Sequence, residues 1–251
     1  MPLSDYQLIQ YIQGVAGAYI NSGYQPTRNT QFDVVAEVID ITATAYFWGV
    51  YGGSYYYSFS NSTSGQYSWR YRASTINALT PQFASGTKLH ITQTVDSSTG
   101  ADLVVEDVST GNTVSFHKNY PSAGNAGKNM YIAGYNQNGT LNYTGNIKMY
   151  SFIIKDSTGT EVRNFVPVRE KVAFGSYIRV GLYDTITGAI FWSGGSGSSQ
   201  NFIAGPDIVD NAVHINVGGT WKKGVPYVKV NGTWKAGKIY VNVNRTWKEG
   251  K

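Results

Sequence analysis

Four carboxylates lie close enough in the sequence to suggest an acid pair for cleaving glycosidic bonds. Hydrolysis of such bonds needs two carboxyl groups about 5 to 10 Å apart. Glu37 and Asp40 are separated by three positions, and in a strand this spacing sends their side chains to opposite faces. Glu106 and Asp107 are adjacent and diverge for the same reason. The spacing therefore favours solvated or turn carboxylates over a hydrolytic pair.

The residue types that hold metals and cofactors are sparse. The chain has no cysteine, and its three histidines, His90, His117 and His214, have no second ligand type at metal spacing. There is no Gly-x-Ser-x-Gly elbow, and the glycine-rich run 193–200 lacks the Gly-Lys-Ser/Thr ending of a phosphate loop. We therefore expect no catalytic residues, no cofactor and no metal, with a calcium ion bound by loop carboxylates near Asp184 as the remaining alternative.

Aromatic residues are concentrated between positions 46 and 71. Strand alternation places one subset in the core and the other on a sheet face, where Tyr and Trp stack on sugar rings or anchor protein interfaces. Arg70 and Arg72 are expected on the face opposite Trp69. We predict a glycan-binding face and keep burial in the core as the alternative. The residues of the predicted face are Tyr55, Tyr57, Trp69 and Tyr71.

Three tryptophans repeat at a fixed interval near the end of the sequence, in the phrases VGGTWKKG, VNGTWKAG and VNRTWKEG. The intervals are 234 − 221 = 13 and 247 − 234 = 13 residues. The Asn-Gly of the middle copy is a strong hairpin signal. So small a unit buries little apolar surface alone, so we expect it to attach to the body, to other copies or to a larger assembly, with a sugar platform as the alternative. The predicted attachment residues are Trp221, Trp234, Trp247, Lys222, Lys235 and Lys248.

The elements that must position these residues are strands. Short runs rich in β-branched and aromatic residues alternate with turns of Gly, Asn, Ser and Thr, and no long segment has a helical period. The pattern predicts an all-β chain, a two-sheet antiparallel sandwich with a small C-terminal β-meander of three repeats. The expected strands are 31–41, 44–51, 54–60, 66–74, 88–96, 102–109, 113–119, 129–136, 144–157, 161–170, 177–185 and 188–194.

Charge divides the chain into two parts. Residues 1–210 carry twelve Lys or Arg and fourteen Asp or Glu, 12 − 14 = −2, whereas residues 211–251 carry eight and one, 8 − 1 = +7. We therefore expect a sandwich over 1–207 and a basic module over 208–251. The basic module is suited to an anionic glycan or an acidic protein, and we do not expect nucleic acid as its partner. The alternative is that its lysines only protect exposed strand edges.

The chain shows no signal for export or membrane insertion. Its start has no basic leader, and no apolar run approaches the roughly 18 residues that a membrane span needs. We therefore expect synthesis in the cytoplasm without membrane insertion. The composition, rich in Tyr, Gly, Ser, Thr and Asn, is nevertheless typical of a β protein that acts on an exposed surface.

Two stretches resemble concanavalin A-like, or laminin G-like, jelly-roll domains of gut bacteria and their phages. Residues 11–38 are similar to the family's opening, and residues 147–168 with 180–208 are similar to its closing strands, with Asn164 where the family pattern has Asp. The resemblance implies a two-sheet jelly roll, an Arg–Asp pair that locks strands, and no counterpart of the carboxylates of related glucanases. The matching positions are Tyr19, Ile20, Gly23, Tyr24, Pro26 and Thr30, then Val162–Pro167, Gly181, Leu182, Tyr183, Asp184, Gly188 and Phe191, and last Phe202, Ala204, Gly205 and Pro206.

The C-terminal repeats are similar to short repeats of phage virion proteins. Together with the jelly-roll resemblance they predict a non-enzymatic virion protein, either a capsid decoration, a head fibre or a tail-associated adhesin. Its expected partners are other capsid or tail proteins, a host-surface or mucosal glycan, and further copies of itself in a homo-oligomer. The alternatives are a bacterial carbohydrate-binding module or lectin and a glycoside hydrolase.

Overall fold

The computed structural model of the chain is built from strands, with one short 3-10 turn, η1 (Leu3–Asp5), and no α-helix among the residues it describes. Those residues fall into two compact units, Met1–Asp207 and Ile208–Lys251. The described positions are 2–62, 66–71, 77–79, 83–96, 98–119, 124–172, 177–194, 201–208, 213–217, 220–224, 227–230, 232–236, 240–243 and 246–249.

The first sheet runs β11-β10-β9-β4-β15-β16-β17-β18, and all of its pairs are antiparallel. Three short strands attach to it: β1 pairs with β16, and β2 pairs with both β15 and β19. The bounds are β1 (Tyr6–Leu8), β2 (Ile12–Gln13), β4 (Gln31–Val38), β9 (Lys88–Asp96), β10 (Gly100–Asp107), β11 (Thr113–Asn119), β15 (Ile147–Lys155), β16 (Glu161–Glu170), β17 (Val180–Asp184), β18 (Ala189–Trp192) and β19 (Ile203–Ala204).

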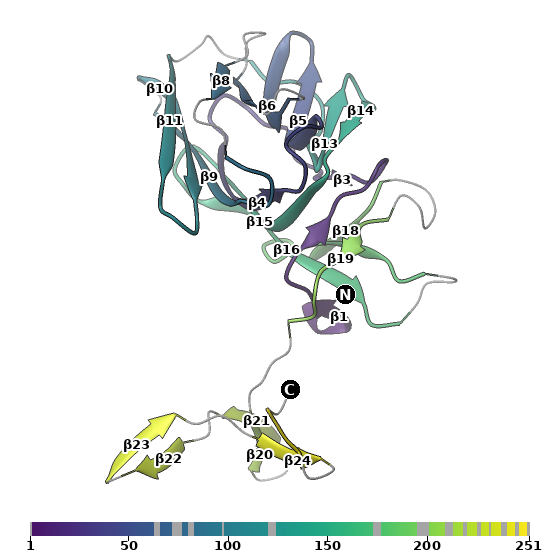
Figure 1. Ribbon diagram of the computed structural model, residues 1–251. Coiled ribbons are helices and arrows are strands. Elements are labelled where there is room, and N and C mark those ends of the chain that lie inside the picture. Colours follow the sequence, from purple (N-terminus) through teal and green to yellow (C-terminus); the bar gives the residue numbers. More distant parts are fainter. Residues whose placement is uncertain are drawn as a thin grey trace. The chain divides into compact units, whose positions relative to one another are not determined.

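The second sheet runs β14-β13-β5-β6-β7-β8, and β12 joins it by pairing with both β5 and β3. Its pairs are antiparallel except for β13 with β5, which is parallel. Figure 1 shows the strands of the two sheets on opposite sides of the first unit. The bounds are β3 (Ile20–Asn21), β5 (Ala45–Gly52), β6 (Tyr55–Asn61), β7 (Tyr67–Tyr71), β8 (Asn77–Leu79), β12 (Tyr131–Ile132), β13 (Gly134–Gln137) and β14 (Thr140–Thr144). The predicted all-β, two-sheet sandwich is confirmed.

The core lies between the sheets and is filled by alternate residues of each strand. On β4, Phe32, Val34 and Ala36 are buried, and they meet Trp48 and Phe59 of the second sheet in one cluster. Full burial of a large apolar side chain stabilises the fold by about 1.5 to 3 kcal/mol. The alternating pattern of apolar residues therefore decides which face of each strand turns inward.

One irregularity in β5 changes this alternation. The register slips between Tyr46 and Trp48, so Tyr46 is paired with Ser60 while Trp48 is paired with Phe59. An extra residue in one strand of an antiparallel pair is a β-bulge, which re-aims the side chains on either side of it. As a result, Phe47 and Trp48 both belong to the core, whereas Tyr46 and Gly49 face outward.

In the second unit each repeat forms one antiparallel hairpin, and the three hairpins follow one another along the chain (Figure 1). Trp221 is paired with Asn216, Trp234 with Lys229 and Trp247 with Asn242. Each tryptophan thus occupies the equivalent position in its hairpin. Gly232 of the Asn-Gly turn has φ +82°, the left-handed conformation that such hairpin turns require. The hairpins are β20 (Val213–Val217) with β21 (Thr220–Gly224), β22 (Tyr227–Val230) with β23 (Thr233–Ala236), and β24 (Tyr240–Val243) with β25 (Thr246–Glu249).

Candidate functional site

The outer face of the second sheet carries a hollow lined by tyrosines and one arginine, which we call the Tyr–Arg pocket. Its volume is about 390 Å³. It lies where β5, β6 and β7 turn their non-core residues away from the first sheet, and where β13 and β14 close one side. The lining residues are Thr44, Tyr46, Tyr56, Arg70, Tyr135, Gln137, Asn142 and Tyr143.

A glycine makes room for the central ring of the pocket. A Cβ atom on Gly49 would lie 2.5 Å from Cδ2 of Tyr135 and 3.1 Å from Cδ1 of Tyr46. Tyr46 stacks on Tyr135 with the ring centroids 4.7 Å apart, and on Tyr143 with the centroids 5.5 Å apart. Tyr46 and Tyr135 are 6% and 3% exposed, so their ring faces are taken up by each other and by the sheet.

Arg70 supplies the positive charge of the pocket. Its guanidinium lies 5.1 Å from the ring centroid of Tyr56 and hydrogen-bonds the Tyr135 hydroxyl. Among the described residues, Arg70 has no carboxylate partner. Arg163, Arg169 and Arg179 differ in this respect, because each of them is paired with an Asp or Glu.

Three phenols of the pocket, those of Tyr46, Tyr56 and Tyr135, are hydrogen-bond donors at neutral pH. Burial raises the pKa of Tyr135, and the charge of Arg70 offsets this only in part. Burial likewise raises the pKa of Tyr46. Burial, the neighbouring Tyr51 and a hydrogen bond to it raise the pKa of Tyr56. The pocket therefore presents a cation and protonated hydroxyls, and no carboxylate is among the described residues that line it.

The residues predicted for a glycan-binding face are on the other side of this sheet. Tyr57, Trp69 and Tyr71 are at most 1% exposed and belong to the core, so the predicted exposure of these three is wrong. The Trp69 Nε1 donates to Gln93 Oε1 over 2.8 Å, and the Tyr71 hydroxyl donates to the carbonyl of Arg28. Tyr55 is partly buried and packs against the same core.

The sequence did indicate which residues of β6 face outward. Ser58 and Ser60 alternate with Tyr57 and Phe59 along β6, and small polar residues mark the outer side of a half-buried strand. The prediction of Arg70 opposite Trp69 is confirmed, because Trp69 is buried in the core and Arg70 lines the outer pocket. Arg72 lies outside the described residues.

Two carboxylates on the outer face of β4, Asp33 and Glu37, are each bound to a lysine. Glu37 on the outer side of β4 accepts from Lys148 Nζ at 2.6 Å and from the Tyr150 hydroxyl at 2.9 Å. Asp33 lies on the same face, four residues earlier, which is about 13 Å along a strand. It accepts from His90 at 2.9 Å and Lys155 at 3.0 Å. These two carboxylates are therefore too far apart to act as a hydrolytic pair.

The other carboxylates singled out in the sequence have local roles. Asp40 accepts from the backbone N–H of Thr42 at 2.8 Å, and Asp107 accepts from that of Ser109 at 2.8 Å, so both cap turns. Glu106 Oε2 lies 3.8 Å from His90 Nδ1. No group of three or more His, Asp or Glu side chains that could hold a metal occurs among the described residues.

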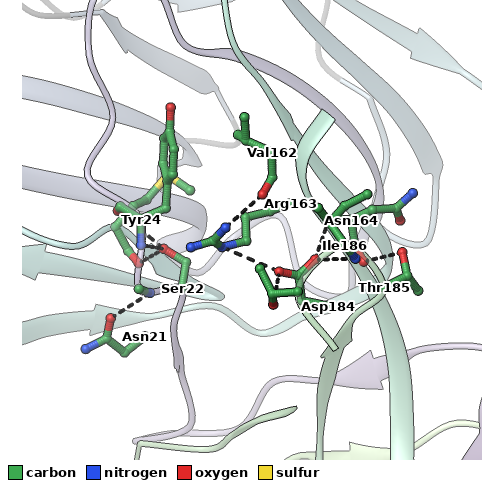
Figure 2. A network of polar contacts seen from close by, with 12 residues as sticks. Asn21, Ser22, Tyr24, Val162, Arg163, Asn164, Asp184, Thr185 and Ile186 are labelled. Atoms are coloured by element: carbon green, nitrogen blue, oxygen red, sulfur yellow. Dashed lines mark hydrogen bonds and ion pairs between the residues drawn. The ribbon is translucent and has the colours of Figure 1, made fainter. Parts of the chain in front are cut away.

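Asp184 is the fully buried carboxylate in the network of Figure 2. It accepts from the backbone N–H of Asn164 at 2.9 Å and of Ile186 at 3.1 Å, and from the Thr187 hydroxyl at 2.6 Å. Arg163 Nε lies 3.5 Å from it. Its oxygens thus face donors, which would repel a cation, so the arrangement supports a brace between β16 and β17 and not a calcium site.

The side chains predicted for attachment lie outside what the structure describes. This holds for Trp221, Trp234 and Trp247 and for the lysines that follow them, Lys222, Lys235 and Lys248. Their predicted role stays a prediction. Within the described positions, no helix combines the length and the apolar character required to cross a bilayer.

Comparison with known proteins finds no family model that matches the chain and no match among curated proteins. Solved structures do match. Scytalido-glutamic peptidase with a peptide-based transition state analog is 14% identical, with a TM-score of 0.39, over 75% of this chain and 100% of that one. SCP-B, described as a member of the eqolisin family of peptidases and solved with the tripeptide Ala-Ile-His, is 15% identical, with a TM-score of 0.34 and the same coverage.

These matches overturn one expectation. The similar structures are described as peptidases, which are enzymes, and this contradicts the prediction of a non-enzymatic virion structural protein with a lectin-like role. Neither that prediction nor its alternatives are retained. Because the TM-scores are below 0.5, we transfer no residue role from the peptidases to this chain. The resemblance to concanavalin A-like domains stays a prediction.

Proposed function

We propose that the first unit is a ligand-binding sandwich that holds an anionic group of its ligand in the Tyr–Arg pocket. The observation that carries the proposal is the state of Arg70. It lies in a hollow among phenol hydroxyls and has no carboxylate partner among the described residues. A guanidinium is always charged and presents planar, paired donors that match an oxyanion.

The surroundings of Arg70 favour an anion over a flat neutral ring. Ring stacking needs an open aromatic face, but Tyr46 and Tyr135 are stacked on each other and buried. These two buried rings can offer a ligand only their hydroxyl edges, which donate hydrogen bonds, whereas Tyr143 is 47% exposed with one face stacked on Tyr46. Gln137 and Asn142, joined by a hydrogen bond at the rim, add amide donors and acceptors. A carboxylate or phosphate fits this set of donors.

The experiment measures binding of a capped tri-glutamate peptide by calorimetry, with inorganic phosphate and a trimer of an acidic sugar as separate arms. Arg70→Met removes the fork of donors, and hydrogen bonds to charged groups contribute about 1.5 to 3 kcal/mol. We therefore expect binding about 10- to 100-fold weaker. Arg70→Lys keeps the charge without the planar fork, so its affinity should lie between those of the unchanged protein and Arg70→Met.

The matched control is Arg169→Met, which removes an arginine that is paired with Asp207 on the first sheet. It should bind like the unchanged protein. Equal affinity in the Arg70 and Arg169 variants would remove the proposal. The relative affinities in the three arms identify the anion that the pocket prefers.

A further inference from the structure

Each of the two large sheets ends in strands whose outer sides are not paired with another strand among the described residues. Such an edge can pair with another chain, and folded proteins prevent this by shortening the edge strand, bending it with a bulge or placing charges on it. Three of the four end strands are short or irregular. β8 has three residues, β18 has four, and β14 has five with a register slip against β13.

The fourth end strand, β11, is long and regular. It has seven residues and no proline, and it pairs with β10 at seven consecutive positions without a slip. Val and Phe within it favour an extended strand. A long, regular edge is a template for a further strand. Among the end strands that the structure describes, β11 is therefore the one best suited to pair with another chain.

One charged residue of β11 lies on the side of the strand that faces the core. Val114 is 7% exposed, Phe116 packs against the core cluster, and Lys118 continues the same alternation. Lys118 is directly opposite Ala101, which is fully buried, and residues directly opposite each other point to the same side. Partial burial lowers the pKa of the Lys118 ammonium, in agreement with this placement. A lysine that is only partly buried keeps its charge at neutral pH.

We propose that Lys118 keeps the β11 edge from pairing with the same edge of a second copy of the chain. A second copy fits this edge because two identical strands can pair antiparallel about a two-fold axis, so that each strand satisfies the other. Pairing would continue the first sheet from one copy into the next. The inference does not depend on the proposed anion binding at Arg70.

The register of such a pair shows why the charge opposes it. In the fully overlapping register the two-fold axis passes through Phe116, and Lys118 of each copy is then directly opposite Val114 of the other. The added strand would cover the lysine with apolar side chains on the side that now faces solvent. Burial of an ammonium without an anionic partner is costly, and the two-fold axis makes it occur twice.

The test is sedimentation velocity of the full chain over a range of concentrations. Lys118→Met keeps the length of the side chain without its charge, so the association constant for pairing two copies should rise at least about 100-fold. Lys118→Arg keeps the charge and should sediment like the unchanged protein. The matched control is Lys171→Met, which removes an exposed lysine on the segment after β16 and lowers the net charge by the same amount. It should also sediment like the unchanged protein.

Hydrogen exchange of the backbone amides identifies the contact. In Lys118→Met, β11 amides that face away from β10 should exchange at least about tenfold more slowly at high than at low protein concentration. Lys118→Leu is a second uncharged variant, and both keep the apolar stem that packs beside the core. Unchanged sedimentation of these two variants, association that leaves β11 unprotected, or equal association of Lys118→Arg or Lys171→Met would each overturn the proposal.

Discussion

At the scale of single residues, two buried tryptophans of the second sheet differ in one hydrogen bond. Trp48 and Trp69 are both 0% exposed. The Nε1 of Trp69 donates to Gln93, whose own Nε2 donates to the Thr30 carbonyl at 3.0 Å. The Nε1 of Trp48 has no partner among the described residues. The same substitution at the two positions therefore isolates the value of this bond.

We expect Trp69→Phe to lower the free energy of unfolding by about 1 to 3 kcal/mol more than Trp48→Phe does. Both variants lose similar apolar volume, but only the first leaves the Gln93 carbonyl oxygen buried without a donor. Urea unfolding followed by circular dichroism measures the difference. Equal losses, or a larger loss for Trp48→Phe, would show that the Trp69–Gln93 bond contributes nothing.

The ion pair at Asp33 predicts a dependence of stability on pH. Burial alone would raise the pKa of Asp33, but hydrogen bonds from His90 and Lys155 and their charges outweigh it and lower the pKa. A carboxylate with a lowered folded-state pKa contributes stability above its unfolded pKa, near 4, and loses it as the pH falls through the folded value.

Asp33→Asn should therefore destabilise the protein at pH 7, by about 1 kcal/mol because the pair is partly exposed. The difference from the unchanged protein should shrink as the pH falls below about 4. Thermal unfolding between pH 7 and pH 3 measures it. A difference that is constant over this range would contradict the assigned role of the ion pair.

At the scale of elements, the bulge in β5 builds the candidate site. Because the register slips after Tyr46, both Tyr46 and Gly49 face outward and support the ring of Tyr135. Gly49 and Ser58, which are directly opposite each other on β5 and β6, test this. At Gly49 a methyl group would collide with two rings, whereas at Ser58 a substitution to Ala only removes a buried hydroxyl without a partner.

We expect Gly49→Ala to destabilise the protein by about 1 to 3 kcal/mol, because the buried Tyr135 ring must move. It should also weaken binding of tri-glutamate. Ser58→Ala should leave the free energy of unfolding within about 1 kcal/mol of the original or raise it slightly. Denaturant unfolding of the pair measures both effects, and a neutral Gly49→Ala would mean that Tyr135 is not held as described.

The strands themselves were largely predictable. Segments 88–96, 113–119 and 161–170 coincide with β9, β11 and β16, because regular alternation and flanking turn residues mark their ends. The candidate site was not predictable to the same degree. A bulge carries no apolar signature, and the parallel pairing of β13 with β5 joins distant segments. The buried face of β6 could have been recognised from Ser58 and Ser60, which alternate with the core residues.

At the scale of the whole molecule, the described residues fall into two units, and the core clusters found among them belong to the first. We expect a fragment ending at Asp207 to fold alone, with a melting temperature within a few degrees of the full chain, since a loss of 1 kcal/mol corresponds to about 2 to 4 °C at this size. It should also bind tri-glutamate as the full chain does. A fragment that aggregates or melts far below the full chain would show that the hairpin repeats support the sandwich.

The central claim is that Arg70 on the second sheet binds the negatively charged group of the ligand. Its most direct test follows the side-chain Nε–H resonances of the arginines by nuclear magnetic resonance while capped tri-glutamate is added to the full chain. The account predicts a saturable shift of the Arg70 resonance, with Arg169 and Arg179 unmoved because Asp207 and Glu170 already occupy them. An Arg70 resonance that stays in place while the peptide binds elsewhere would contradict it.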